Sequence, residues 1–290
     1  MGNSIKIVET PRDAWQGLNK TIPVDYKVQA IQLLLSAGFD IVDVGSFVSE
    51  KAVPEMANTD DVIAGLDLTE SKSQIMVLCG NAKGAEKASA YQQINYISFP
   101  FSVSETFLQK NINSGFQKAW FNLVRITEIC NRSGKFPFIY LTMAFGNPYG
   151  DPVNLEIIHN WVDQLNELGI KFIGLSDIIG VAKPEFISAT YALLTEQYPQ
   201  IEFGLHLHIV DDDWYDKVDA AFKNGCRIFD GVINGMGGCP MTGYEMLGNI
   251  PTSNILTYAS LNGIFTNVNQ KKFSVAKSFM DQLINPVENT

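Results

Sequence analysis

The chain has 290 residues, of which 46% are hydrophobic and 18% are charged, and its formal net charge is −10. This composition is typical of a globular protein with a sizeable core, and the acidic balance argues against nucleic acid or an anionic membrane as a partner. No apolar run is long enough to span a membrane. The first residues resemble neither a signal peptide nor an arginine-rich transit segment, so we expect a cytoplasmic protein.

The four cysteines are scattered along the chain and include no Cys-x-x-Cys pair. Disulfide scaffolding and a thiolate zinc site are therefore not expected, and a reducing compartment fits. We interpret Cys79, Cys130 and Cys226 as small buried residues. One of the three histidines, His159, lies in a stretch with helical spacing, and we assign it to the surface or to packing.

Taken in chain order, short β-branched or apolar runs predict eight strands. They lie at residues 5–10, 39–47, 74–79, 94–101, 136–145, 171–178, 201–209 and 227–234. Segments with helical spacing fall between them, for example at residues 24–37, 115–133, 154–168, 184–197 and 212–224. Glycines at positions 38, 169 and 225 provide helix stops. The tail, residues 251–290, predicts one or two further helices.

Eight alternating strand–helix units without a Pro-, Gly- or Ser-rich linker predict an α/β fold, a (β/α)8 barrel. We expect a single domain over residues 1–290, with one or two extra helices at the C-terminal end. The alternative is an open, doubly wound sheet. Against that alternative, no Gly-x-Gly-x-x-Gly follows the first strand.

A barrel of this kind has its active site at the carboxyl ends of the strands and in the loops that follow them. The polar residues expected there are Arg12, Asp13, Asp43, Ser46, Asp177, His206, His208, Cys239 and Asn249. Strands one, seven and eight are close neighbours in a closed barrel. We therefore expect Asp13, His206, His208 and Asn249 to converge, with both histidines on one face of their strand.

One carboxylate, two imidazoles and an amide oxygen suit a divalent metal such as Mg²⁺, Mn²⁺, Co²⁺ or Zn²⁺. Such a metal would polarise a substrate bound through a hydroxyl and a carbonyl oxygen. Arg12 would place a fixed positive charge beside a developing enolate. The glycines before Cys239 predict a mobile loop that brings the thiol over the site.

Four segments of the chain resemble the hydroxymethylglutaryl-CoA lyases, within the metal-dependent (β/α)8 lyases and Claisen-type synthases. They are Val-Glu-Thr-Pro-Arg-Asp at 8–13, Ser-Phe-Val-Ser-Glu-Lys-Ala-Val-Pro at 46–54, Ser-Glu-Thr-Phe at 104–107 with Lys-Asn-Ile-Asn at 110–113, and Gly-Gly-Cys-Pro at 237–240 through Gly-Asn at 248–249. The last segment is similar to the signature loop of the lyases. The resemblance runs from about residue 5 to residue 267 and implies a pyruvate carboxyltransferase-like barrel domain.

The resemblance implies cleavage of hydroxymethylglutaryl-CoA to acetyl-CoA and acetoacetate, the default pathway being leucine breakdown. Its implied metal ligands are Asp13, His206, His208 and Asn249, with Mg²⁺ or Mn²⁺ as the expected ions. It makes Arg12 the enolate-stabilising residue and Cys239 the proton-transfer residue, with His206 assisting at the substrate hydroxyl. Asp43 and Asp177 would support the site. An acyl-CoA substrate and a homo-oligomer, a dimer or larger, are also implied.

Two other reactions and one non-catalytic interpretation stay open. Trp15, Ile178 and Ile209 differ from the residues usual in the resembled lyases, so the substrate could be a related 3-hydroxy-3-alkylglutaryl-CoA. A Claisen-type acyltransferase that condenses acetyl-CoA with a 2-oxo acid shares the His-x-His pair, but it usually has a longer C-terminal region and lacks the Gly-Gly-Cys-Pro loop. A non-catalytic binding protein would be expected to have lost ligands, and the set here is intact.

Overall fold

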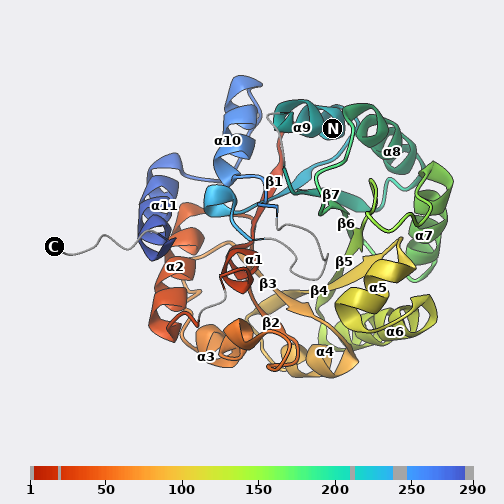
Figure 1. Cartoon of the computed structure of the whole chain (residues 1–290). Coiled ribbons are helices and arrows are strands. Elements are labelled where there is room, and N and C mark those ends of the chain that lie inside the picture. Colours follow the sequence, from red (N-terminus) through yellow and green to blue (C-terminus); the bar gives the residue numbers. More distant parts are fainter. Residues whose placement is uncertain (1–2, 19–20, 210–212, 238–246, 285–290) are drawn as a thin grey trace.

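Eight parallel strands close into a barrel in chain order, and β8 is hydrogen-bonded back to β1 (Figure 1). The structure is a computed structural model, and it describes residues 3–18, 21–209, 213–237 and 247–284. The strands are β1 Lys6–Glu9, β2 Ile41–Phe47, β3 Gln74–Cys79, β4 Ile94–Ser102, β5 Phe136–Thr142, β6 Phe172–Asp177, β7 Glu202–Leu207 and β8 Ile228–Gly231. The predicted (β/α)8 barrel is confirmed.

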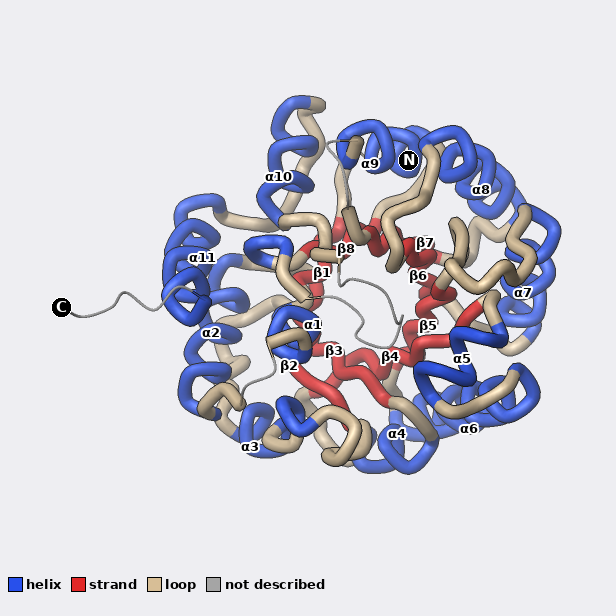
Figure 2. Tube along the Cα trace, in the orientation of Figure 1, coloured by secondary structure: helices blue, strands red, loops and turns tan. Residues whose placement is uncertain are grey.

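The helices form a ring around the barrel, as Figure 2 shows. They are α1 Pro11–Gln16, α2 Val24–Ala37, α3 Thr59–Ala64, α4 Ala82–Ser89, α5 Glu105–Ile112, α6 Phe116–Ser133, α7 Leu155–Glu167, α8 Pro184–Gln197, α9 Trp214–Lys223, α10 Thr252–Leu261 and α11 Gln270–Ile284, with 3-10 turns at Pro54–Met56 and Ile233–Gly235. None of the helices in the described part of the chain combines the length and the apolar character needed to cross a membrane.

The two C-terminal helices have different places in the fold. Helix α10 follows β8 and lies beside α9, where the eighth helix of the barrel belongs (Figure 1). Helix α11 is the additional one, and it packs on α2. The rings of Tyr26 and Phe279 stack with centroids 4.5 Å apart, and the Tyr26 hydroxyl donates to the Phe279 carbonyl. The tail therefore adds one helix to the regular barrel.

Predicted and observed boundaries agree for β3, α2 and α8, and they differ elsewhere by a few residues. The largest differences are at β8, predicted over residues 227–234 but observed over Ile228–Gly231, and at β5, predicted to run to residue 145 but ending at Thr142. Met143 takes a left-handed backbone conformation with φ 58°, which ends the extended strand. The predicted helix at 212–224 is observed as α9, and residue 212 lies outside the described residues.

The barrel interior has an apolar layer below a polar one. The apolar layer comprises Val8, Ile41, Met76, Tyr96, Phe138, Tyr140 and Ile228, with Phe172 against it. Because successive inward positions in a strand are two residues apart, the next positions along β2 and β8 are Asp43 and Asp230. Tyr140 lies two residues beyond Phe138 on β5 and joins the two layers. The apolar layer fills the amino end of the barrel and leaves the carboxyl end for polar chemistry.

Glu9, at the end of β1, links the first strand to the segments after β8. Its side chain is fully buried, and its two oxygens accept hydrogen bonds from the Ile233 amide at 2.7 Å and the Thr252 hydroxyl at 2.5 Å. Burial raises the pKa of Glu9 to about 8, although both hydrogen bonds lower it. The folded protein therefore holds a proton on Glu9 that the unfolded chain releases near its ordinary value.

Replacing Glu9 with glutamine is expected to make the free energy of unfolding less dependent on pH. A raised carboxyl pKa gives stability that is fully present below about pH 4.5 and is lost as pH rises to about 8, at up to ~1.4 kcal/mol per pH unit. Urea unfolding measures the free energy of unfolding of wild type and of Glu9→Gln. As pH rises from about 4.5 to about 8, this free energy should fall more for the wild type than for the variant. If the difference in unfolding free energy between the two proteins stays constant with pH, the pKa of Glu9 is not raised in the folded protein.

Candidate active site

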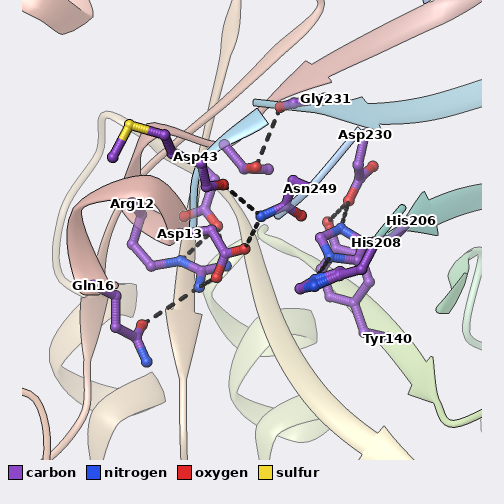
Figure 3. Close-up of polar contacts among 12 residues, drawn as sticks. Arg12, Asp13, Gln16, Asp43, Tyr140, His206, His208, Asp230, Gly231 and Asn249 are labelled. Atoms are coloured by element: carbon purple, nitrogen blue, oxygen red, sulfur yellow. Dashed lines mark hydrogen bonds and ion pairs between the residues drawn. The ribbon is translucent and has the colours of Figure 1, made fainter. Parts of the chain in front are cut away.

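Arg12 and Asp13 lie at the carboxyl end of β1 because helix α1 starts at once with Pro11, a residue suited to the first helical position. The Arg12 guanidinium is almost entirely buried and joins two carboxylates. Its Nε and Nη2 donate to Asp43 Oδ2 at 2.9 and 2.7 Å, and its Nη1 donates to Asp13 Oδ1 at 2.9 Å (Figure 3). The positive charge of Arg12 is therefore fixed between β1 and β2.

The two carboxyl groups beside Arg12 differ in their proton affinity. Burial raises the pKa of Asp43 to about 6, against the lowering effect of Arg12, and the nearby Asp13 and Asp230 raise it further. Burial also raises the pKa of Asp13, but Arg12, His206 and His208 together hold it below its ordinary value. Asp13 is therefore ionised at neutral pH, as a metal ligand must be.

His206 and His208 lie at the carboxyl end of β7 with their Nε2 atoms 3.3 Å apart. The Nδ1 atom of His208 lies 2.9 Å from the Leu247 carbonyl oxygen. A carbonyl only accepts, so the ring hydrogen is on Nδ1 and the lone pair is on Nε2. Burial and the neighbouring His206 lower the pKa of His208 to about 4, so this ring is neutral at ordinary pH.

Asp13, His206 and His208 offer one ligand atom each within 4.8 Å of one another. Asn249 joins them through an antiparallel bridge with His208. Its amide nitrogen donates to Asp13 Oδ2 at 2.7 Å and to the Met236 carbonyl at 2.8 Å, so the amide oxygen is the atom left for a ligand role. Figure 3 shows that oxygen on the side of the histidines. The predicted convergence of these four residues is observed.

The donor set fits a divalent cation. The Nε2 lone pair of His208 faces the Nε2 atom of His206 at 3.3 Å, beside the ionised carboxylate of Asp13. A mixed set of imidazole, carboxylate and amide oxygen suits Mg²⁺, Mn²⁺, Co²⁺ or Zn²⁺.

The glycine before the Gly-Cys-Pro segment is needed because of close packing. Gly237 has φ +92°, and a Cβ atom on it would lie 2.7 Å from the Asp13 carbonyl oxygen and 3.0 Å from Asn249 Nδ2. Any side chain here would displace two of the converging residues. Cys239 itself, the predicted proton-transfer residue, lies outside the described residues.

Asp177 forms its hydrogen bonds with the loop after β6 and not with the cluster of Asp13, His206, His208 and Asn249. It ends β6, and its oxygens accept hydrogen bonds from the amides of Ile179 at 3.3 Å and Ala182 at 2.6 Å. The carboxylate thus shapes the loop after β6, which carries Ile178 into the cavity wall. The cysteines at 79, 130 and 226 are free and buried, and His159 pairs with Gln197 on the outer helices, as predicted.

Tyr140 and Asp230 are two site residues that the sequence analysis did not single out. The Tyr140 hydroxyl donates to Asp230 Oδ2 at 2.6 Å, and the same oxygen lies 3.1 Å from His206 Nδ1. A signal was available: Asp230 is a carboxylate in the middle of an apolar strand, two residues after the inward-facing Ile228. Counting inward positions along β5 and β8 would have found both.

A cavity of about 480 Å³ opens over this group of side chains. Arg12, Asp13, His206 and His208 line it, and Lys110 and neighbouring residues at the C-terminal end of α5 line it too. A larger hollow of about 550 Å³ lies at the amino end of β1 and β2, away from these residues. The candidate active site is therefore a cleft with ligand atoms, a buried guanidinium and a basic residue among its lining.

The chain is similar to one known family and to several known proteins. The family described as HMGL-like matches residues 4–280. Mitochondrial hydroxymethylglutaryl-CoA lyase of Mus musculus is 29% identical over 97% of this chain and 86% of that protein. A crystal structure of Bacillus subtilis HMG-CoA lyase is similar with a TM-score of 0.91 and 28% identity, covering 100% of this chain and 98% of the other.

An HMG-CoA lyase from Acinetobacter baumannii, solved in complex with coenzyme A and 3-methylmalate, is also similar. Its TM-score is 0.88 and its identity 25%, over 99% of this chain and 96% of that one. These similarities extend over the whole barrel.

Proposed function

The chain belongs to the HMGL-like family and is a carbon–carbon lyase, and we propose that it cleaves hydroxymethylglutaryl-CoA to acetyl-CoA and acetoacetate. The observation that carries this proposal is the cluster of Asp13, His206 and His208 at the cavity, with Arg12 beside it. The similar protein solved with coenzyme A supports an acyl-CoA as the substrate.

Asp13, His206, His208 and Asn249 would hold the divalent metal, Mg²⁺ or Mn²⁺ first and Co²⁺ or Zn²⁺ as alternatives. When bound, it supplies Lewis-acid polarisation and a template for the substrate oxygens. Nε2 is the atom of His206 near the other ligands, so the proposed metal binding falls to that atom. The proposed assistance of His206 at the substrate hydroxyl would then be to orient that group beside the metal rather than to accept its proton.

The cleavage transfers the proton of the tertiary hydroxyl to solvent water in the open cavity and breaks the bond between the hydroxyl-bearing carbon and the methylene carbon next to the thioester. The electron pair of that bond forms the enolate of acetyl-CoA, and the hydroxyl carbon becomes the ketone of acetoacetate. Arg12 stabilises the enolate oxygen through a charge that Asp43 and Asp13 already hold in place. Cys239 is proposed to supply the proton that converts the enolate to acetyl-CoA. Asp43 supports Arg12 directly, and Asp177 supports the loop that carries Ile178 into the cavity wall.

One observation favours a second candidate, cleavage of a related 3-hydroxy-3-alkylglutaryl-CoA. Ile178 lines the cavity, at a position where the resembled lyases usually have threonine. An apolar side chain in the wall suits an alkyl group larger than methyl. Condensation of acetyl-CoA with a 2-oxo acid is the third candidate. A single domain over 1–290, a homo-oligomer, a cytoplasmic location and a place in leucine breakdown are further proposals.

The proposal is tested with purified protein, hydroxymethylglutaryl-CoA and Mg²⁺ or Mn²⁺, by following the release of acetyl-CoA. We expect metal-dependent cleavage at about 1 to 1000 per second, abolished by a chelator. If the protein binds metal but leaves this substrate intact, the 3-alkyl homologues are tested next, and then acetyl-CoA with 2-oxo acids. Turnover of one of these substrates alone would replace the first proposal.

Cys239→Ser is the variant that tests the proposed proton-transfer residue. A hydroxyl is a much weaker acid than a thiol, so we expect the variant to bind metal and to remain folded but to lose most of its turnover. Cys226→Ser is a matched control, since Cys226 is buried between strands, where its thiol contacts the carbonyls of Phe203 and Ile228 and the side chain of Tyr191, and it does not line the cavity. Full turnover by Cys239→Ser would remove this residue from the mechanism.

A further inference from the structure

Asp230 lies beside His206 on the neighbouring strand, at the same level of the barrel. Strands β7 and β8 pair with Gly204 opposite Ile228, and the next inward residues are His206 and Asp230. The distance from Asp230 Oδ2 to His206 Nδ1 is 3.1 Å. We propose that Asp230 is a positioning residue that holds the hydrogen of His206 on Nδ1 and so keeps Nε2 free to bind the metal.

The hydrogen-bond pattern determines which group donates. Asp230 Oδ2 already accepts from the Tyr140 hydroxyl at 2.6 Å, which identifies it as a carboxylate oxygen (Figure 3). A carboxylate oxygen has no hydrogen to give, so the His206 Nδ1 beside it is the donor. The lone pair of the neutral ring then lies on Nε2, the atom that faces His208.

The burial of the Asp230 carboxylate indicates that its contact with His206 is a hydrogen bond that the fold requires. The Asp230 side chain is 2% exposed, and its other oxygen, Oδ1, is buried without a hydrogen-bond partner among the described residues. No lysine or arginine of the described chain forms an ion pair with it. A buried carboxylate is costly unless it is hydrogen-bonded. Here the bonds that offset this cost go only to Tyr140 and His206, both of which line the cavity.

The position of the tyrosine is also built into the fold. Gly174 lies on the next strand, and a Cβ atom there would approach the Tyr140 ring to 2.7 Å. A glycine at this point leaves room for the ring and so brings its hydroxyl to Asp230. The tyrosine thus fills one acceptor direction of Oδ2 and leaves the other for the imidazole.

The inference rests on the proposed metal-binding role of His206, but its test requires no substrate. The chain has three histidines, so protein labelled with ¹⁵N-histidine gives three imidazole spectra, one of them from the surface residue His159. At alkaline pH, where the rings are neutral, we expect both buried histidines of the wild type to have hydrogen on Nδ1. A wild-type spectrum with the His206 hydrogen on Nε2 would overturn the proposal without any variant.

The Asp230→Ala variant removes the carboxylate that accepts the hydrogen bond from His206 Nδ1. We expect one of the two buried imidazoles to change to a mixture of tautomers, while His208, held by the Leu247 carbonyl, keeps its spectrum. We also expect the Kd for Mn²⁺ to rise about 10- to 100-fold, the usual effect of losing an outer-shell partner. A folded variant with unchanged spectra and unchanged Mn²⁺ affinity would overturn the proposal.

Asp163→Asn is the matched control. Asp163 accepts a hydrogen bond from the Tyr198 hydroxyl beside His159, so a tyrosine, an aspartate and a histidine again lie together, here on the outer helices. We expect this variant to leave the two buried imidazoles and the Mn²⁺ affinity as in the wild type. The imidazole spectra and the Kd for Mn²⁺ do not depend on the substrate. If the protein does not cleave hydroxymethylglutaryl-CoA, the proposed role of Asp230 can therefore still be confirmed or rejected.

Discussion

Replacing His208 with alanine is expected to abolish tight binding of one divalent metal per chain. His208 is buried, its Nε2 lies 3.3 Å from His206 Nε2, and that atom is the metal ligand in our proposal. The Kd for Mn²⁺ should rise by more than the ~10- to 100-fold that loss of an outer-shell partner produces. Metal titration followed by Mn²⁺ spectroscopy measures this directly.

Thermal unfolding gives a second readout of the same variant. A metal that binds only the folded state stabilises it by about 2.7 kcal/mol at a concentration of 100 Kd. Wild type should gain this stabilisation with Mn²⁺, and His208→Ala should gain almost none. His159→Ala is the control, because it removes the third histidine from the outer helices. Tight stoichiometric metal in His208→Ala would show that His208 is not a ligand.

Replacing Arg12 with alanine is expected to reduce turnover roughly 10²- to 10³-fold at saturating metal, the usual cost of losing one preorganised oxyanion donor. The same change removes the counter-charge of a buried carboxylate. Asp43 is fully buried and receives two hydrogen bonds from Arg12. Breaking a buried pair in this way costs about 3–5 kcal/mol of unfolding free energy at neutral pH.

The stability loss of Arg12→Ala should depend on pH in a defined direction. The pKa of Asp43 is about 6 with Arg12 present, and without Arg12 it rises further. A raised carboxyl pKa favours the folded state at low pH and disfavours it as pH rises, so the variant should differ least from wild type near pH 4 and most above pH 6. Urea unfolding at several pH values measures this trend.

A double variant separates the electrostatic role of Arg12 from its role in catalysis. Arg12→Ala combined with Asp43→Asn no longer leaves a charged Asp43 without its partner, although Asp13 still loses its contact with Arg12, so most of the stability should recover while turnover stays low. The loss of turnover would then come from the missing positive charge beside the enolate. Recovery of turnover in the double variant would instead make Arg12 a structural residue only.

Local patterns in the sequence were enough to predict the barrel. The alternation of apolar runs and helical spacing depends on each segment alone, which is why β3, α2 and α8 have the predicted bounds. Strand order follows from the closed barrel, so the meeting of Asp13 with His206, His208 and Asn249 was predictable as well. The residue types and their positions at strand ends determined the kind of site.

The tertiary structure alone decided which polar groups bind one another. Asp43 and Asp177 look equivalent in the sequence, yet Asp43 binds Arg12, whereas Asp177 binds the amides of its own loop. The contact between Asp230 and His206 depends on the register of two strands and on which side chains face inward at the same level. Such contacts join residues far apart in the chain, whose distance is determined only when all eight strands close.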